Sequence, residues 1–280
     1  MIKKIPFVIT YDFDGTLAPG NMQEHNFIPE LNMKRVEFWK QTKQLAKEQN
    51  ADEILAYMLL MIQKANTERV QITKEAFSKS GESIKLFPGV LDWFSRINAY
   101  GKEKGVEVKH YIISSGLREM IEGTPIAKEF EKIYASGFMY DQNNVAEWPA
   151  LAVNYTTKTQ YLFRINKGSL EVHDNSVINK FVKDEERPVP FPNMVFIGDG
   201  DTDIPCMRLV KDKGGCSIAV YKKNTKGARN KAFQLVNNGR ASLGVVADYS
   251  KDSAIEKAVM AMIDRVVAQK NINDAGIKPE

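Results

Sequence analysis

A short apolar run that ends in two carboxylates constrains this chain more than any other feature. Residues 5–10, IPFVIT, are nearly all apolar, and Asp12 and Asp14 follow closely, one residue apart. Alternate residues of a strand point to the same face of a sheet, so two aspartates placed this way repel each other. The repulsion costs free energy unless a cation lies between the carboxylates. The pattern therefore predicts a buried strand that leads into a cation-binding loop.

Further apolar runs predict a parallel sheet. Near-continuous apolar character is typical of parallel strands that are covered by helices on both faces. Helical patterns at residues 90–100, 120–133 and 252–270 lie between or after these runs. The alternation predicts an α/β fold with a doubly wound, Rossmann-like parallel sheet, whose ligands bind beyond the carboxyl ends of the strands. The expected strands are residues 5–11, 106–114, 132–138, 193–199, 216–221 and 244–249.

The spacing of the first two strands predicts an inserted domain. About 100 residues separate Asp12 from Ser114, whereas a strand–helix–strand unit needs only about 30. Residues 33–49 and 52–66 have helical patterns, and Asp52 is suited to cap the second of these helices. We therefore expect a small helical cap domain at residues 19–86, inserted into an α/β core formed by residues 1–18 and 87–280.

The composition restricts the class of protein and its surroundings. A hydrophobic fraction of 43%, a charged fraction of 26% and a formal net charge of +4, with no Lys/Arg block, are typical of an ordinary globular protein and argue against a nucleic-acid partner. Cys206 and Cys216 form no Cys-x-x-Cys pattern, which suits a reducing compartment. The apolar run at the start is too short for a signal peptide, and no run approaches the length of a membrane span. We expect a cytoplasmic protein without a membrane partner.

A second strand also ends in acids, within the sequence FIGDGDTDIPCM. Two parallel strands that both end in carboxylates build one oxygen-rich site, and this is the ligand set that Mg²⁺ prefers. With Asp12 and Asp14 on the first strand, Asp199 is the expected direct ligand on the second. Asp203 is the second choice, through water, and Asp201 is expected to be a solvated loop residue.

Small residues near the predicted strand ends are suited to a phosphate group. The hydroxyl of Ser114, preferred over Ser115, stands before Gly116 and a predicted helix, although an ordinary helix cap would have the same pattern. Gly15 permits a tight turn whose backbone N–H groups can cradle an anion, and the hydroxyl of Thr16 can fix that loop.

A phosphoryl centre among acids needs a further positive charge. Two lysines precede the fourth expected strand, Lys158 in YTTKTQYLF and Lys167 in FRINKG. The residues alone leave the choice between them open.

Taken together and in this order, these sequences resemble the haloacid dehalogenase superfamily of phosphohydrolases. Lys158 fits the family's lysine, which opens a helix, better than Lys167 does. The insertion after the first motif, and the FPGV sequence that follows it, look like the phosphoserine phosphatase-like branch. The matching motifs are D-x-D-G-T-L at residues 12–17, Ser114, Lys158, and G-D-G-x-x-D at residues 198–203.

The resemblance implies a Mg²⁺-dependent phosphatase that acts on a small phosphorylated metabolite. Asp12 would attack phosphorus and form an aspartyl-phosphate. Mg²⁺ would lie between Asp12, the backbone carbonyl of Asp14 and Asp199. Ser114 and Lys158 would hold the phosphoryl oxygens, and Asp14 would act as the acid and then the base.

Other readings remain open at this stage. An acid at Asp14 is absent from the dehalogenase branch and from the ion-pump ATPases, but phosphomutases keep it. A phosphomutase or phosphotransferase, or a non-catalytic phosphate- or nucleotide-binding module, is therefore an alternative. Neither the substrate nor the oligomeric state follows from the sequence. The cap side chains that could touch a substrate are Glu24, His25, Glu30, Arg35, Trp39 (more simply a core residue) and Arg69, and Arg118 lies near the second motif.

Overall fold

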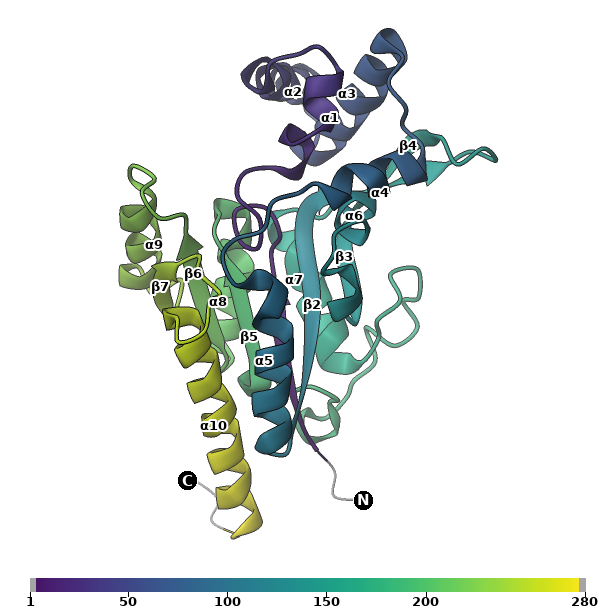
Figure 1. The fold of residues 1–280 in the computed structure, drawn as a ribbon. Coiled ribbons are helices and arrows are strands. Elements are labelled where there is room, and N and C mark those ends of the chain that lie inside the picture. Colours follow the sequence, from purple (N-terminus) through teal and green to yellow (C-terminus); the bar gives the residue numbers. More distant parts are fainter. Residues whose placement is uncertain (1–3, 277–280) are drawn as a thin grey trace.

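A seven-stranded sheet forms the centre of the computed structural model, which describes residues 4–276 (Figure 1). The strand order is β4-β3-β2-β1-β5-β6-β7, and all neighbours are parallel except β3 and β4. The connections change direction at β1, which lies between β2 and β5. This strand order confirms the predicted doubly wound sheet. Open α/β sheets bind their ligands at the point where the connections reverse. The strands are β1 Ile5–Tyr11, β2 Val106–Leu117, β3 Lys132–Tyr140, β4 Ala146–Leu151, β5 Met194–Gly198, β6 Cys216–Tyr221 and β7 Leu243–Val246.

Helices cover both faces of the sheet (Figure 1). Apolar side chains of α5 (Val90–Glu103) and α10 (Ala254–Asp274) pack against one face, and those of α7 (Tyr155–Lys167), α8 (Ile204–Asp212) and α9 (Ala228–Asn237) against the other. Since both faces are buried, the parallel strands have the near-continuous apolar sequences from which they were predicted. Within residues 4–276, no helix combines the length and hydropathy that a bilayer-spanning segment requires.

A buried polar chain fixes the end of β1. The indole N–H of Trp93 donates to the Tyr11 hydroxyl at 2.7 Å, so that hydroxyl donates in turn to Nδ1 of His110 at 2.9 Å. The other ring nitrogen of His110 then donates to Asn98 Oδ1 at 3.0 Å. Burial lowers the pKa of His110 to about 3, so the ring stays neutral. The residue before Asp12 is thereby held in one position.

One local prediction was wrong, and one strand was not predicted. Residues 120–133 do not form one helix, because Gly123 and Pro125 interrupt it: α6 covers only Arg118–Glu122, and a 3₁₀ turn covers Ala127–Glu129. Strand β4 was not predicted. It is an edge strand, partly exposed, where Pro149 is tolerated because no neighbour needs its N–H.

The segment between β1 and α5 is helical and lies above the carboxyl ends of the strands (Figure 1). It contains α1 (Phe27–Glu30), α2 (Arg35–Gln49), α3 (Glu53–Glu68) and α4 (Lys74–Glu82). The carboxylate of Asp52 accepts hydrogen bonds from the amides of Ile54 and Leu55 at the start of α3, as predicted. The division into a core and a cap at residues 19–86 remains a prediction.

Helix α4 packs on α6 of the α/β part at backbone contact. A side-chain carbon at Gly81 would overlap the carbonyl of Met120, and one at Gly123 would overlap the carbonyl of Ser78. The two glycines therefore allow the helices to approach each other.

We expect Gly81→Ala to destabilise the protein. In an open helix this change would add about 1 kcal/mol of stability through helix propensity. Here the overlap should outweigh that gain, since overpacking costs about 1–3 kcal/mol. Lys79→Ala on the exposed face of α4 is the control and should stay within about 0.5 kcal/mol of the parent. Urea unfolding measures both, and a stabilised Gly81→Ala would contradict this packing.

Candidate active site

Three carboxylates meet at the carboxyl ends of two neighbouring strands. Asp12 follows β1 directly, Asp199 follows β5, and Asp203 closes the loop after β5. Each offers an oxygen, and these three oxygens all lie within 4.8 Å of one another. The cluster arises because β1 and β5 are adjacent and parallel. The structure thus brings together the acids that the sequence predicted for a cation site.

The ammonium group of Lys158 lies between two of these acids. Lys158 is fully buried on α7, and its Nζ is 2.7 Å from Oδ1 of Asp203 and 3.1 Å from Oδ1 of Asp12. Burial opposes the charged amine, but the two carboxylates raise the pKa of Lys158, which stays protonated. Burial and the charge of Asp203 raise the pKa of Asp12 to about 6, although Lys158 acts in the opposite direction.

Asp203 organises the loop that carries Asp199. Its Oδ2 accepts hydrogen bonds from the backbone amides of Asp199, at 3.2 Å, and of Gly200, at 3.1 Å. With Lys158 on its other oxygen, this carboxylate is occupied by the protein on both sides. The Asp199 carboxylate makes no such hydrogen bonds among residues 4–276, is half-buried and lines the cavity. Asp201 is exposed and pairs with Lys231.

Asp14 is held by the segment that leads into the helices above the sheet. Its Oδ1 accepts a hydrogen bond from the amide of Met22 at 2.9 Å. Burial and the charge of Asp12 raise the pKa of Asp14 well above its usual range. Its other oxygen faces Gly116, where a side chain would overlap Met22. Asp14 is therefore a buried carboxyl group with a raised pKa at the wall of the cavity.

The turn after Asp14 differs in part from the prediction. Gly15 has a φ of +74°, and a side chain there would overlap the Asp199 carboxylate, so glycine is needed. The amides of Gly15 and Thr16, however, donate to the carbonyls of Ala18 and Phe13, at 2.7 and 3.2 Å. The buried hydroxyl of Thr16 has no hydrogen-bond partner among the described residues. The loop itself uses these two amides, and the roles of Gly15 and Thr16 toward a substrate remain predictions.

Within residues 4–276, the Ser114 hydroxyl donates no hydrogen bond and only accepts one. Its Oγ accepts the amide of Gly116 at 3.1 Å, and both serines of the SSG sequence line the cavity. The carbonyl of Ser115 accepts the hydroxyl of Tyr57, at 2.9 Å, and that of Ser136, at 3.2 Å. Tyr57, from α3, was not predicted here, since nothing in an apolar helical stripe marks one aromatic residue as a contact to a distant loop.

The two lysines make different contacts. Lys167 donates to the backbone carbonyls of Ile178 and Lys180, at 2.6 and 2.8 Å, and so fastens the long loop before β5. Only Lys158 reaches the acids.

A cavity of about 680 Å³ opens above the acids. Among the expected cap contacts, only Trp39 lines it, and the Trp39 indole donates to Glu24 at 2.8 Å. Arg118 pairs with the buried Glu119 instead. Several lining residues that sequence reasoning missed lie on loops and helix faces without a local motif; they include Gln23, Lys43, Glu53, Ile54, Tyr57, Phe87, Tyr221, Lys222 and Lys231.

Comparison with protein families identifies this arrangement. A family model described as haloacid dehalogenase-like hydrolase matches residues 9–208, which include all the acids and Lys158. The chain belongs to this family. An uncharacterized protein of Borreliella burgdorferi is 28% identical over 284 residues, which cover 91% of this chain and 95% of that protein.

Solved structures of the family share the fold. A haloacid dehalogenase family hydrolase from Salmonella enterica serovar Typhi has a TM-score of 0.56 at 17% identity, covering 86% of this chain and 67% of its own. A probable phosphoserine phosphatase from Vibrio cholerae also has a TM-score of 0.56, at 14% identity, covering 95% of this chain and 67% of its own. A phosphoserine phosphatase with a phospho-aspartyl intermediate analogue has a TM-score of 0.52 at 14% identity, covering 86% of this chain and 94% of its own. The predicted phosphoserine phosphatase-like architecture of this family member is confirmed.

The positions of the two lysines predict different effects on rate. Lys158→Ala should lower the rate of hydrolysis about 10²-fold or more, the scale of removing one electrostatic stabiliser. Lys167→Ala should leave turnover nearly unchanged, because its amine contacts only loop carbonyls. Steady-state assays of both variants, with circular dichroism to confirm folding, provide the measurement. The reverse ranking would contradict the placement of the catalytic lysine.

Proposed function

We propose that the protein is a Mg²⁺-dependent phosphomonoester hydrolase that acts on a small phosphorylated molecule through an aspartyl-phosphate on Asp12. The observation that carries this proposal is the position of the Asp12 carboxylate. It lies at the point where the sheet reverses, 3.1 Å from the buried ammonium of Lys158 and beside a carboxyl group, Asp14, whose pKa is raised. Membership of a hydrolase family supports the same reaction class.

The acid cluster fits a hard divalent cation. Three carboxylate oxygens within 4.8 Å of one another repel, and burial together with the charge of Asp203 raises the pKa of both Asp12 and Asp199. Oxygen ligands of this kind suit Mg²⁺, which completes its shell with water. Asp12, Asp199 and the backbone carbonyl of Asp14 would hold it, with Asp203 behind them. When bound, the ion supplies positive charge that screens nucleophile and phosphate from each other.

In the first step, a carboxylate oxygen of Asp12 attacks phosphorus. The bond between phosphorus and the leaving oxygen breaks, and Asp14 transfers its proton to that oxygen, so an alcohol departs. The hydroxyl of Ser114 and the ammonium of Lys158 stabilise the charge on the phosphoryl oxygens.

In the second step, water attacks the phosphorus of the aspartyl-phosphate. Asp14, now ionised, accepts a proton from this water, and the bond between phosphorus and the Asp12 oxygen breaks. Inorganic phosphate leaves, Asp12 is again a free carboxylate, and Asp14 is again protonated. The two aspartates of the opening motif thus have different tasks.

Residues 19–86 act in this proposal as a cap that excludes bulk water and selects the leaving group. Two contacts support this role: Met22 holds Asp14, and Tyr57 holds the loop of Ser114. A cytoplasmic location also belongs to the proposal, and the free, buried thiols of Cys206 and Cys216 are consistent with a reducing compartment.

The alternatives differ in what happens to the intermediate. A phosphomutase or phosphotransferase would pass the phosphoryl group to a second substrate instead of water, and a regulatory module would bind phosphate without turnover. The complete set of acids, with the pKa of Asp14 raised by burial and by the charge of Asp12, favours hydrolysis over simple binding.

Activity should depend on a divalent metal ion. The close carboxylates are poorly compatible without a cation, so hydrolysis of p-nitrophenyl phosphate should stop in EDTA and return with excess Mg²⁺. Full activity in chelator would contradict the metal assignment, and absence of activity under every metal condition would favour the binding module.

Asp12→Asn should abolish turnover of every phosphate ester, because no aspartyl-phosphate can form and nothing nearby replaces the nucleophile. Turnover in Asp12→Asn at the rate of the parent would mean that another group attacks phosphorus.

Asp14→Asn should affect the two leaving groups unequally. General acid catalysis is worth roughly 10²–10⁴-fold, and it matters most when the leaving alkoxide is strongly basic. The variant should lose most of that factor in the first step with an alkyl phosphate. With p-nitrophenyl phosphate it should retain a rapid burst of p-nitrophenol, followed by slow hydrolysis. Rapid-mixing kinetics measure both, and equal losses without a burst would remove the acid–base role of Asp14.

A further inference from the structure

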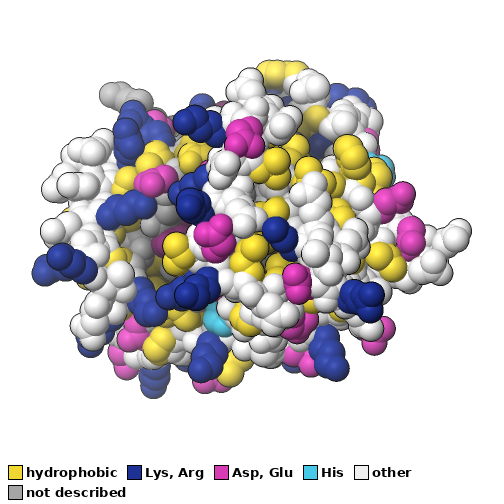
Figure 2. All heavy atoms as spheres, turned by 90° about the horizontal axis from the view of Figure 1, so that it is seen from above, with side chains coloured by type: hydrophobic (Ala, Val, Ile, Leu, Met, Phe, Trp, Pro, Cys, Tyr) yellow, Lys and Arg dark blue, Asp and Glu magenta, His cyan; other side chains and the backbone are white. Residues whose placement is uncertain are grey.

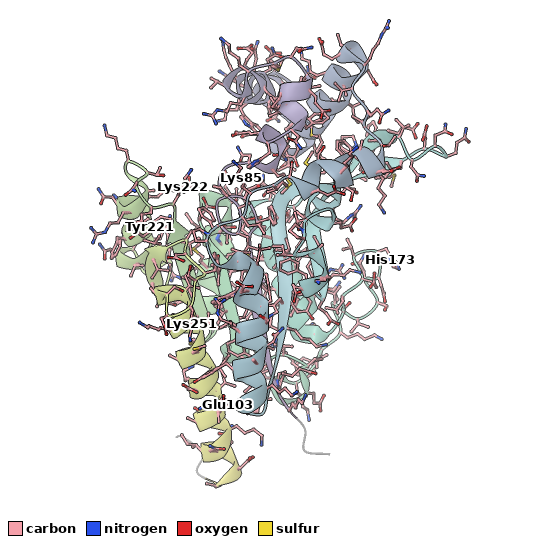
Figure 3. The ribbon with its side chains drawn as sticks, viewed as in Figure 1. Lys85, Glu103, His173, Tyr221, Lys222 and Lys251 are labelled. Carbon is pink, nitrogen blue, oxygen red and sulfur yellow. The ribbon has the colours of Figure 1, made fainter. Side chains whose placement is uncertain are left out.

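Lysines surround the mouth of the cavity. Lys43 on α2, Lys222 after β6 and Lys231 on α9 all line it and are exposed. Figure 2, which views the molecule from above, shows Lys and Arg side chains gathered around a hollow. Figure 3 places Tyr221 and Lys222 at the upper end of β6, below the helices that lie over the sheet. We call Lys43, Lys222 and Lys231 the basic rim.

The basic rim has no counterpart in the hydrolytic chemistry. Lys158 already supplies the buried positive charge beside Asp12. Lys231 pairs with Asp201 at 3.1 Å, whereas Lys43 and Lys222 take part in no ion pair among residues 4–276. Above the acids at the floor, Glu53 is the one acidic residue of the lining. Two positive charges at the mouth are therefore left for a ligand.

Apart from the acids and the basic rim, much of the cavity lining is apolar. Trp39, Ile54, Tyr57 and Phe87 contribute to it, from α2, α3 and the segment before α5. A volume of about 680 Å³ is far more than one phosphate group occupies and is in the range of pockets that enclose a whole small molecule. With a phosphate at Asp12, the cavity therefore has room for a leaving group that shares its lining with the lysines.

We propose that the preferred substrates carry a second anionic group on the leaving-group side, bound by Lys43 and Lys222 with help from Lys231. This inference rests on the proposed phosphatase function and names its substrate class. A second phosphate and a carboxylate share the required chemistry, and a phosphate matches the two unpaired lysines in charge. Since Lys43 comes from α2 and Lys222 from the loop after β6, such a group would bridge the helices above the sheet and the α/β part.

A competing explanation is general steering, in which a positive mouth attracts any phosphate ester. Steering would raise the rates of singly and doubly anionic substrates together. Recognition of a second anion raises the rate of the doubly anionic substrate selectively. The ratio of the two rates therefore separates the explanations.

The test uses flexible substrates that do not presuppose a natural scaffold. They are α,ω-alkanediol bisphosphates with spacers of increasing length, the matched alkanediol monophosphates, and ω-carboxyalkyl phosphates as the carboxylate arm. Initial kcat/KM values are measured with Mg²⁺ for the parent, for Lys43→Gln/Lys222→Gln and for Lys47→Gln/Lys223→Gln. Lys47 and Lys223 lie on the same helix and loop, are exposed and do not line the cavity, so the control removes equal charge.

We expect one spacer length at which the bisphosphate exceeds its monophosphate by about tenfold or more, beyond the factor of two for its two ends. Lys43→Gln/Lys222→Gln should bring this ratio close to that factor, and the control should keep it. A larger advantage for the carboxylate arm, lost in the same variant, would support the inference with a carboxylate as the anion.

Two results would overturn the inference. Hydrolysis of p-nitrophenyl phosphate without any preference for a second anion, or with a preference that both double variants keep, would do so while leaving the phosphatase function intact. Failure to hydrolyse any of the esters would overturn the phosphatase function, and the substrate class with it.

Discussion

The structure depends on one buried ammonium group held between two carboxylates. Removing the charge of Lys158 from water is unfavourable, and only Asp12 and Asp203, at 3.1 and 2.7 Å, compensate for it. The three residues come from segments far apart in the chain: the end of β1, the first turns of α7 and the loop after β5. Because none of the three charges is tolerable alone in the interior, the assembled sheet and the assembled site require each other.

Further hydrogen bonds spread outward from this ion pair. Asp203 orders the backbone of Asp199, and Asp199 in turn leaves room for no residue but glycine at position 15. On the other side, Asp14 holds Met22, and Tyr57 reaches down to the carbonyl of Ser115. The helices above the sheet are thus fastened to the two loops that carry the proposed acid and the phosphate-binding hydroxyl. A shift of these helices would therefore change the positions of both groups.

The sequence was informative where a physical requirement left a local trace. Buried strands need apolar runs, and β1 and β6 have the predicted bounds. Acids at strand ends, and Asp52 as a helix cap, were found by the same reasoning. Prediction failed where the deciding partner is distant. The 120–133 helix was predicted from its apolar spacing in spite of Gly123 and Pro125, and β4 exists because β3 offers an edge for it.

Other features could not be read from a local pattern at all. Lys158 and Lys167 lie on the same helix, α7. The packing of this helix directs Lys158 to the acids and Lys167 to the loop before β5. The basic rim likewise joins Lys43 to Lys222 across the molecule. Each of its lysines has ordinary charged neighbours in the sequence. Their common position is visible only in the structure, where all three line the same cavity.

The central claim is that Asp12 becomes covalently phosphorylated during turnover. The most direct measurement is acid quenching of the enzyme within the first turnover of p-nitrophenyl phosphate, followed by peptide mass spectrometry at low pH. We predict the added mass of one phosphoryl group on the peptide that contains Asp12, increased in Asp14→Asn because the second step is slowed. The adduct should disappear on treatment with hydroxylamine, which cleaves acyl phosphates. Phosphorylation of a different residue, or a full burst of p-nitrophenol without any adduct on this peptide, would contradict the account.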